Sequence, residues 1–326
     1  MWKILFTARQ NFSNFVVEET ITTTITTMAQ FEIKDGVAII PEGITEIGED
    51  TFYDCVSLES VIIPESIKEI GECAFWNCES LKSITLPKSV TKIGDNAFGS
   101  CTSLESITLP ESVASIGWYA FTGCKSLKNV TLPDSVTFLG ENAFSGCTSL
   151  ESVTIPESVT RIDHYVFNNC SSLKSITIPE SVKDIGIGTF RWCTALESIT
   201  LPESVTRIGC YAFMGCTSLK NITIPDSVTR IEQNAFKGCA SLKNVAIPGS
   251  VREIEEYAFE GCTSLTTVIL PVRMKEINLT AFYKCPSLST IYVPAEKTEY
   301  YKELLPEKLH GKIVELEPEN RTKVRK

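Results

Sequence analysis

The chain has 326 residues, 43% of them hydrophobic and 21% charged, and a formal net charge of −10. This acidic balance argues against a nucleic acid as the partner, because binding phosphates requires clustered lysine and arginine side chains. No segment approaches the ~18 consecutive apolar residues of a membrane-spanning helix, so the sequence predicts no membrane span.

The N-terminal residues 1–27 are predicted to form a disordered leader. Their first apolar run is only Ile4–Phe6, whereas a secretory signal needs about 7–15 apolar residues. Residues 17–27 are rich in threonine and have no counterpart elsewhere in the chain, and Met28 is an alternative start of the protein. The lack of a signal peptide predicts a cytoplasmic location.

Residues 28–40 are predicted to cap the N-terminal end of the fold with a β-hairpin. The dipeptide Asp35-Gly36 favours a tight two-residue turn between two strands. Apolar residues alternate on both sides of this turn, at Phe31, Ile33, Val37 and Ile39.

Residues 41–294 contain eleven copies of one 23-residue unit. A phenylalanine, a cysteine and a leucine recur in the same register as a proline. The prolines are Pro41, Pro64, Pro87, Pro110, Pro133, Pro156, Pro179, Pro202, Pro225, Pro248, Pro271 and Pro294. A period of this length predicts stacked coils that each bury an apolar side against their neighbours.

One unit can be divided by its apolar spacing. Residues 104–109 predict a short strand that ends at Pro110, because proline cannot donate a hydrogen bond within a sheet. Gly117 allows a turn, and the spacing of residues 120–124 predicts one helical or 3₁₀ turn. The inward side chains are Leu104, Ile107, Leu109, Val113, Ile116, Ala120, Phe121 and Cys124.

Residues 295–318 are predicted to cap the C-terminal end of the stack. Lys297–Leu305 has the pattern of a short amphipathic helix, and Lys312–Leu316 that of a closing strand. Residues 319–326 are predicted to be a frayed basic tail.

The unit resembles the BspA-like (Treponema-type) class of leucine-rich repeats, over Pro41–Pro294. It follows the pattern L-x-x-[IV]-x-[IL]-P-x-S-[IV]-x-x-I-G-x-x-A-F-x-x-C. One copy consists of Leu81, Ile84, Leu86, Pro87, Ser89, Val90, Ile93, Gly94, Ala97, Phe98 and Cys101. The resemblance implies a right-handed α/β-type leucine-rich-repeat solenoid with a concave parallel β-sheet. It also implies a cell-surface or secreted protein, because the family is rich in surface antigens and adhesins.

Eleven of the thirteen cysteines lie in one inward column, from Cys55 to Cys285, at one per coil. This register predicts small buried thiols rather than metal ligands, because zinc needs several ligands that converge on one point. A row of free thiols suits a reducing compartment. Cys73 and Cys210 lie in outward columns and are therefore the candidates for reactive thiols. No cofactor or metal is expected.

The sequence predicts no enzyme. The only histidines, His164 and His310, lie in an outward column and in the C-terminal cap, away from any repeated inward group that could complete a catalytic site. Serines such as Ser112 recur in nearly every coil, which indicates a structural role, namely hydrogen bonds to local backbone at the turn.

The outward threonines of the strands are a candidate platform for an extended protein or a glycan. They include Thr108, Thr131, Thr154 and Thr177. The alternative is that threonine simply suits a solvated strand, and a regular serine-x-threonine grid also has an analogy with ice-binding solenoids. An alternating Glu/Lys column beside them predicts charge pairing between adjacent coils.

Aromatic residues on the opposite, convex side form a second candidate surface, a strip where other coils mostly carry acidic or polar residues. Its members are Trp118, Tyr119, His164, Tyr165, Trp192 and Tyr211. Tryptophan and tyrosine are typical anchors of protein interfaces. The alternatives are that the rings lie flat on the turns, and that duplication of coil pairs explains their spacing.

These observations favour a non-enzymatic protein-interaction scaffold, adhesin-like and binding a host or cell-surface protein such as an extracellular-matrix protein. The alternative is a structural, surface-covering repeat protein without a specific ligand. The sequence leaves the identity of the partner, the face that binds it and the oligomeric state open.

Overall fold

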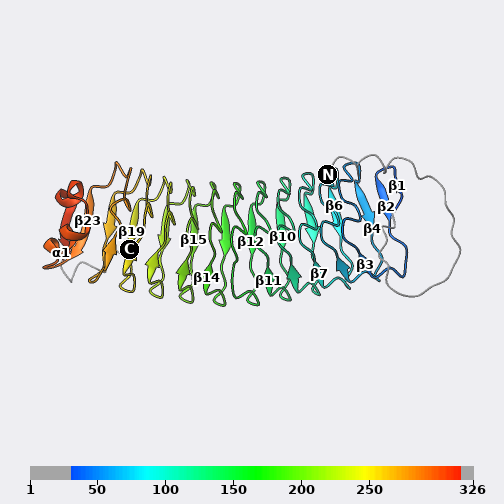
Figure 1. Ribbon diagram of the computed structural model, residues 1–326, viewed down its shortest axis with the longest axis horizontal. Helices are drawn as coiled ribbons and strands as arrows, with labels where there is room; N and C mark the ends of the chain where they lie inside the picture. The colour runs from blue at the N-terminus through cyan, green and yellow to red at the C-terminus, as the bar shows by residue number, and fades with distance from the viewer. Residues whose placement is uncertain (1–30, 317–326) are drawn as a thin grey trace, which may run out of the picture.

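The computed structural model describes residues 31–316, which form one elongated stack of coils along a single axis (Figure 1). Each 23-residue coil begins at a repeat proline, so coil 1 begins at Pro41 and coil 11 at Pro271. The predicted leader 1–27, the predicted tail 319–326, and residues 28–30 and 317–318 of the predicted caps lie outside the described residues. The predicted solenoid fold is confirmed.

One row of strands runs along the whole stack and contains the strands that the sequence predicts. Where neighbouring strands of this row pair, each residue lies beside the residue 23 positions further on, as Thr85 pairs with Thr108 in a parallel ladder. The strands are β2 (Val37–Ile39), β4 (Ser60–Ile62), β6 (Ser83–Thr85), β8 (Ser106–Thr108), β10 (Asn129–Thr131), β12 (Ser152–Thr154), β13 (Ser175–Thr177), β15 (Ser198–Thr200), β17 (Asn221–Thr223), β19 (Asn244–Ala246), β21 (Thr267–Ile269) and β23 (Thr290–Pro294). We call the outward side of this row the strand face.

A second row of parallel strands, which the sequence reasoning missed, follows each proline turn. Each strand is only two residues long, and its inward residue is an isoleucine or leucine, which a glycine follows in all strands of the row but the last three, where Glu or Asn follows it. The strands are β3 (Glu46–Ile47), β5 (Glu69–Ile70), β7 (Lys92–Ile93), β9 (Ser115–Ile116), β11 (Phe138–Leu139), β14 (Asp184–Ile185), β16 (Arg207–Ile208), β18 (Arg230–Ile231), β20 (Glu253–Ile254) and β22 (Glu276–Ile277). We call the outward side of this row the second face.

The segment predicted as a helical or 3₁₀ turn is a run of tight turns. Backbone N–H groups bond to carbonyls three residues earlier, as from Gly99 to Asn96 and from Cys101 to Phe98, which is the 3₁₀ pattern. Two residues in each such run have left-handed backbone, Asn96 at φ 56° and Ser100 at φ 60° in coil 3. Left-handed residues cannot continue a right-handed helix, so the run stays a series of turns.

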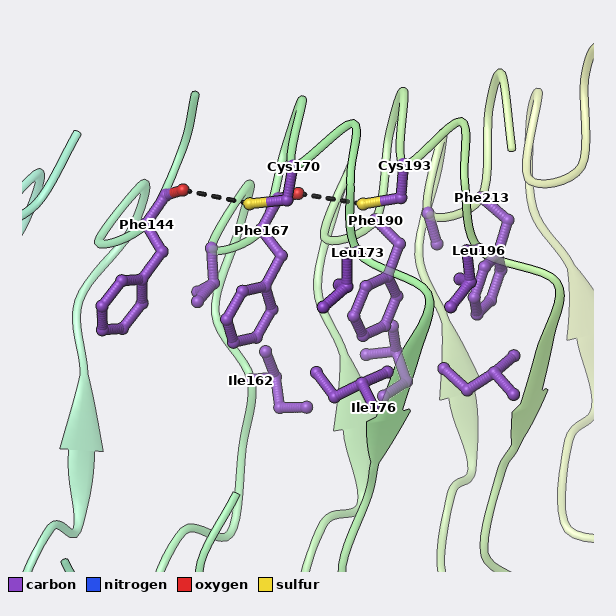
Figure 2. Packing of buried hydrophobic residues seen from close by; sticks show 14 of the residues in the cluster. Phe144, Ile162, Phe167, Cys170, Leu173, Ile176, Phe190, Cys193, Leu196 and Phe213 are labelled. Carbon is purple, nitrogen blue, oxygen red and sulfur yellow. Dashed lines mark hydrogen bonds between the residues drawn. The ribbon is translucent and has the colours of Figure 1, made fainter. Parts of the chain in front are cut away.

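The core is a column of identical side chains rather than a mixed cluster. The rings of Phe52 and Phe75 lie 5.1 Å apart and nearly parallel, and equivalent pairs repeat along the stack as far as Phe282. Figure 2 shows four of these rings side by side, from Phe144 to Phe213, above the leucine and isoleucine layers. Each ring is buried by the coils on both sides, so no coil can bury its core alone.

Different elements cover the two ends of the stack. At one end β1 (Ile33–Lys34) pairs with β2 in an antiparallel hairpin, whose turn residues Asp35 and Gly36 have φ 50° and 77°. At the other end, α1 (Thr298–Leu304) and the 3₁₀ helix Glu307–Lys312 precede β24 (Ile313–Leu316), which pairs with β23. Tyr301 of α1 is fully buried against the last coils.

Candidate functional site

The aromatic strip divides into half-buried members (His164, Tyr165 and Tyr211) and exposed members (Trp118, Tyr119 and Trp192), and His164 has a structural role. Its Nδ1 atom accepts a hydrogen bond of 2.9 Å from the backbone N–H of Ile187 in the next coil. The imidazole ring therefore provides an acceptor for a backbone N–H group that would otherwise have no hydrogen-bond partner in the stack.

The rings of Tyr165 and Trp192 cover glycines of the next coil, and Trp192 nevertheless remains 41% exposed. A Cβ atom added at Gly188 would come within 2.3 Å of the Tyr165 ring, and one added at Gly215 within 2.4 Å of the Trp192 indole. These glycines are therefore required by the rings that cover them. For these two residues the structure supports the alternative that the aromatic rings cover the turns.

The tyrosines of the strip share an unusual backbone conformation. Tyr119, Tyr165 and Tyr211 have φ values of 56–61°, in the left-handed region. The same position holds Asn96 and Asn142 in neighbouring coils, and asparagine tolerates this region better than other residues with side chains. Each tyrosine therefore carries a local conformational cost that asparagine largely avoids, which packing or binding must offset. Tyr211 itself is half-buried.

Trp118 and Tyr119 are exposed, with 53% and 40% of their surface accessible. Asp95 of the preceding coil accepts a hydrogen bond from the backbone N–H of Trp118 at 2.8 Å, which fixes the backbone at this position but leaves the indole in solvent.

Phe138 of β11, which the sequence reasoning did not select, is 44% exposed in the coil after Trp118. Most other coils carry a charged residue at its position, such as Lys92 or Arg161, so an isolated phenylalanine in this column was a usable signal. We call Trp118, Tyr119 and Phe138 the aromatic patch. It lies where the charged column of the second face is interrupted.

The predicted threonine platform is present as an in-register column on the strand face. Thr108, Thr131, Thr154 and Thr177 are all exposed, and Thr154 pairs directly with both Thr131 and Thr177. Their hydroxyl groups form no hydrogen bond with the described residues, so they face solvent.

The predicted charge pairing beside the threonines is confirmed. Lys128 lies 3.1 Å from Glu105, Lys174 lies 2.8 Å from Glu151, and Lys220 lies 2.6 Å from Glu197. The paired lysines lower the pKa values of Glu151 and Glu197 by hydrogen bonding and by their charge. This column is therefore electrically neutral along much of the strand face.

Ten of the eleven column cysteines, from Cys78 to Cys285, are buried thiols. Each of them donates a hydrogen bond of 3.1–3.2 Å to the phenylalanine carbonyl of the preceding coil, as Cys170 does to Phe144 (Figure 2). Burial raises the pKa of Cys193 to about 12, and it raises the pKa values of Cys124 and Cys147 well above the ordinary range. These thiols are donors in the core and stay protonated at neutral pH.

Cys73 and Cys210, the candidates for reactive thiols, lie in surroundings that disfavour the thiolate. Desolvation, followed by nearby carboxylates, raises the pKa of Cys73 to about 11. Desolvation and a hydrogen bond to Glu232 raise the pKa of Cys210 to about 11. A raised pKa leaves almost no nucleophilic thiolate at neutral pH.

The recurring serine also has a different partner from the one expected. Ser135 donates its hydroxyl to the carbonyl of Val113 at 2.7 Å, and Ser181 donates to Val159 at the same distance. The acceptor is the backbone of the preceding coil rather than of the local turn. The serine is structural, as predicted, but it links coils.

Within residues 31–316, no group of three or more histidine, cysteine, aspartate or glutamate side chains is arranged to hold a metal ion. His310 lies in the C-terminal cap, where its Nε2 is 3.0 Å from the carbonyl of Leu305. None of the helices in this part of the chain has the length and apolar character to cross a membrane.

Comparison with known proteins agrees with this architecture. The description "BspA type Leucine rich repeat region" matches residues 23–150, 91–193 and 183–305. No curated protein sequence matches the chain.

Several solved structures are similar to this chain. A leucine-rich repeat protein from Bacteroides ovatus is 29% identical, over 93% of this chain and 100% of that one, with a TM-score of 0.46. One from Eubacterium ventriosum is 25% identical, over 81% and 88%, with a TM-score of 0.51. The pneumococcal vaccine antigen PcpA is 22% identical, over 86% and 79%, and shares the fold with a TM-score of 0.57. With its repeat, core column and coil geometry, this chain belongs to the BspA-type leucine-rich repeat family.

Proposed function

We propose that this chain is a non-enzymatic scaffold that binds a partner protein through the aromatic patch of Trp118, Tyr119 and Phe138. Leucine-rich repeat proteins generally act as protein-interaction scaffolds. The observation that carries the proposal is the coincidence of three exposed aromatic side chains at the place where the second face lacks charge.

The energetics of the patch support a binding role. Exposing large aromatic side chains gives up the favourable burial of apolar surface, and exposed apolar patches on repeat proteins commonly mark interfaces. Charged residues such as Lys92 and Arg161 border the patch along the same column. An apolar centre with a polar rim is the usual composition of a protein interface.

The adhesin-like form of this proposal names a host or cell-surface protein as the partner, with extracellular-matrix proteins as the first candidates. A glycan is the other ligand that fits exposed aromatic rings, and it would bind to the same patch. The resemblance to surface antigens is the only argument for this choice of partner.

The experiment is a binding measurement on immobilised extracellular-matrix proteins and glycans, with the full chain and a Trp118→Ser/Phe138→Ser variant. We expect saturable binding to one of them, and the variant should bind at least ~30-fold more weakly, because central aromatic anchors contribute about 2 kcal/mol or more. A Trp192→Asn variant is the matched control, since it removes an indole that is 41% exposed and covers Gly215 but lies outside the aromatic patch.

Equal affinity of the patch variant and the full chain would exclude the patch as the binding site. A loss of the same size in the Trp192→Asn control would indicate a general effect on folding instead. Circular dichroism of both variants separates these two outcomes.

The in-register threonine column favours a second candidate, a surface-covering protein that contacts ice. The Lys128–Glu105 and Lys174–Glu151 pairs lie beside this column and stay strongly hydrated, which argues against the candidate. Thermal hysteresis in dilute solution tests it directly, and we expect none.

A further inference from the structure

The strand face has a hollow where the repeat departs from its pattern, in coils 8 to 10. The threonine column ends at Thr223 and continues with Ala246, while the acidic column that follows the repeat proline ends at Asp226 and continues with Gly249. The hollow has Ile222 and Ile269 in its floor. Asn221 and Asn244 line its sides, and Glu203 and Asp226 lie at its rim.

The small residues that open the hollow are not required by packing. A Cβ atom added at Gly249 would meet no atom within 4 Å, unlike the glycines of the second face, whose added Cβ atoms would collide with the preceding coil. Threonine occupies the position of Ala246 in the seven preceding coils, so the coil can hold a larger side chain there. The open space is therefore a feature of this sequence and not of the fold.

The carboxylates at the rim have no cationic partner. Glu203 and Asp226 are exposed, and neither takes part in an ion pair among the described residues. One oxygen of Glu203 accepts the backbone N–H of Asp226 at 3.1 Å. Glu197 on the same face is, by contrast, held by Lys220. The hollow thus combines an apolar floor with two negative charges that nothing in the fold neutralises.

We propose that this hollow binds an arginine side chain presented by an extended basic segment of a partner protein. The isoleucine floor is suited to the aliphatic stem of the side chain, and the two carboxylates are suited to the guanidinium group, which donates several hydrogen bonds in a planar fork. The proposal concerns the strand face and does not depend on the aromatic patch, which lies on the second face.

The rest of the segment lies along the strand face beside the acidic column. This column has one exposed carboxylate in each of six successive coils, namely Glu111, Asp134, Glu157, Glu180, Glu203 and Asp226. Coils about 4.8 Å apart give this column a length of about 24 Å, which equals about seven residues of extended chain. The partner segment is therefore about seven residues long, with basic residues on one side.

The test uses a fluorescein-labelled heptapeptide of alternating arginine and threonine, titrated with the full chain while the anisotropy is measured. A second peptide carries citrulline, which has the shape of arginine without its charge. We expect saturable binding of the arginine peptide at low salt and binding at least tenfold weaker for the citrulline peptide. Saturable binding that is equal for both peptides, or no saturable binding at all, overturns the proposal.

Matched variants locate the binding site. Glu203→Gln/Asp226→Asn should weaken binding about tenfold, because charge-assisted hydrogen bonds are the strong ones. Glu151→Gln/Glu197→Gln removes the same two negative charges from the ion-paired column and should change the affinity less than about twofold. An equal loss in both double variants shows non-specific attraction and overturns the proposal.

A third variant tests the hollow itself. Ala246→Thr restores the residue that seven other coils carry, so the fold should be kept while the floor is covered. We expect binding to weaken several-fold, with an unchanged thermal unfolding curve. Full affinity in this variant contradicts the role of the hollow.

Discussion

Coil 5 and coil 6 have almost the same sequence pattern but differ in how closely they stack. In coil 5 the Phe144 ring lies 5.2 Å from that of Phe121. In coil 6 the Phe167 ring lies 5.8 Å from its neighbours on both sides, Phe144 and Phe190. Coil 6 also lacks the two-residue strand of the second row and keeps only a single bridge, between Ile162 and Ile185.

The wider ring spacing around coil 6 coincides with larger side chains at one inward position. Coil 6 has Val166 and coil 7 has Thr189 where coil 5 has Ala143, and all three are buried. The glycine column that includes Gly140 does not set this spacing, because Glu232 and Glu255 occupy it in coils 9 and 10, whose phenylalanine rings lie only 5.2 Å apart. The comparison teaches that the distance between rings follows the size of the buried inward side chains.

The largest expected effect is on stability at alkaline pH. Burial raises the pKa values of eight column thiols above the ordinary value of 9.0, so the folded state keeps protons that the unfolded state loses. This contribution to stability is fully present below pH 9 and decreases as the pH rises above it. Each thiol lowers the free energy of unfolding by up to ~1.4 kcal/mol per pH unit.

Thiolate absorbance and circular dichroism should therefore change together in an alkaline titration. This experiment also compares coil 6 with the tightly stacked coils. Mass spectrometry after alkylation at pH 9.5 shows whether Cys170 of coil 6 reacts before Cys124 of the regular region. Thiolate formation well below the pH of unfolding would contradict the burial of the column.

The next largest effect is expected from Phe121→Ala, which removes a ring from the tightly stacked region. Loss of a fully buried phenylalanine should cost about 3–5 kcal/mol of the free energy of unfolding. Phe167→Ala should cost about 1 kcal/mol less, because its ring already lies further from its neighbours and loses weaker contacts. Urea unfolding curves measure both values, and a larger cost for Phe167→Ala would disprove the interpretation of coil 6.

A smaller effect is expected when the residue of coil 6 is placed in coil 5. Gly140→Asp should destabilise the chain by about 1–3 kcal/mol, because its side chain overlaps the preceding coil. Asp163→Gly should change stability by less than this, since the coils already accommodate a side chain there and the change removes one hydrogen bond to the His164 N–H. Gly249→Ala is the control, with an expected change within ~0.5 kcal/mol. If Gly140→Asp and Gly249→Ala have the same thermal unfolding midpoint, the close backbone approach at Gly140 does not require glycine.

The smallest effect is expected from the exposed ion pairs, which occur both in the tightly stacked coils and in coil 6. Glu105→Lys removes the ion pair with Lys128 and should lower stability by at most ~1 kcal/mol, because the pair is exposed. The double variant Glu105→Gln/Lys128→Gln should restore most of the loss, because it leaves no like charges side by side in the column. A loss that persists in this double variant would mean that Glu105 has a role beyond charge pairing.

Much of the fold could be predicted from the repeat because its period is fixed. The spacing of Leu104, Ile107, Phe121 and Cys124 places these side chains inward, and the structure buries all four. The second row of strands was missed because two residues, such as Ser115 and Ile116, are too few to show a strand period. Their pairing depends on the next coil, which local sequence does not describe.

The candidate site was predicted only in part, because the exposure of an outward side chain also depends on the neighbouring coil. Trp118 and Trp192 are both outward tryptophans in the sequence, but Trp192 also covers Gly215 of the next coil and is 41% exposed, whereas Trp118 is 53% exposed. Whether a ring covers its neighbour depends on the backbone conformation of one coil and on the side chain in the next. Phe138 was missed because it differs from its neighbours only when the same position is compared across several coils.

The sequence by itself determined that the coils stack, which residues point inward, and that the thiols form a row. It could do so because every coil repeats the same inward positions, and burial of apolar side chains enforces this register. Only the tertiary structure decided the spacing of the coils, the partners of the serine and cysteine donors, and which outward side chains stay exposed. These properties arise from contacts between residues 22–26 positions apart, where the geometry of two coils acts together.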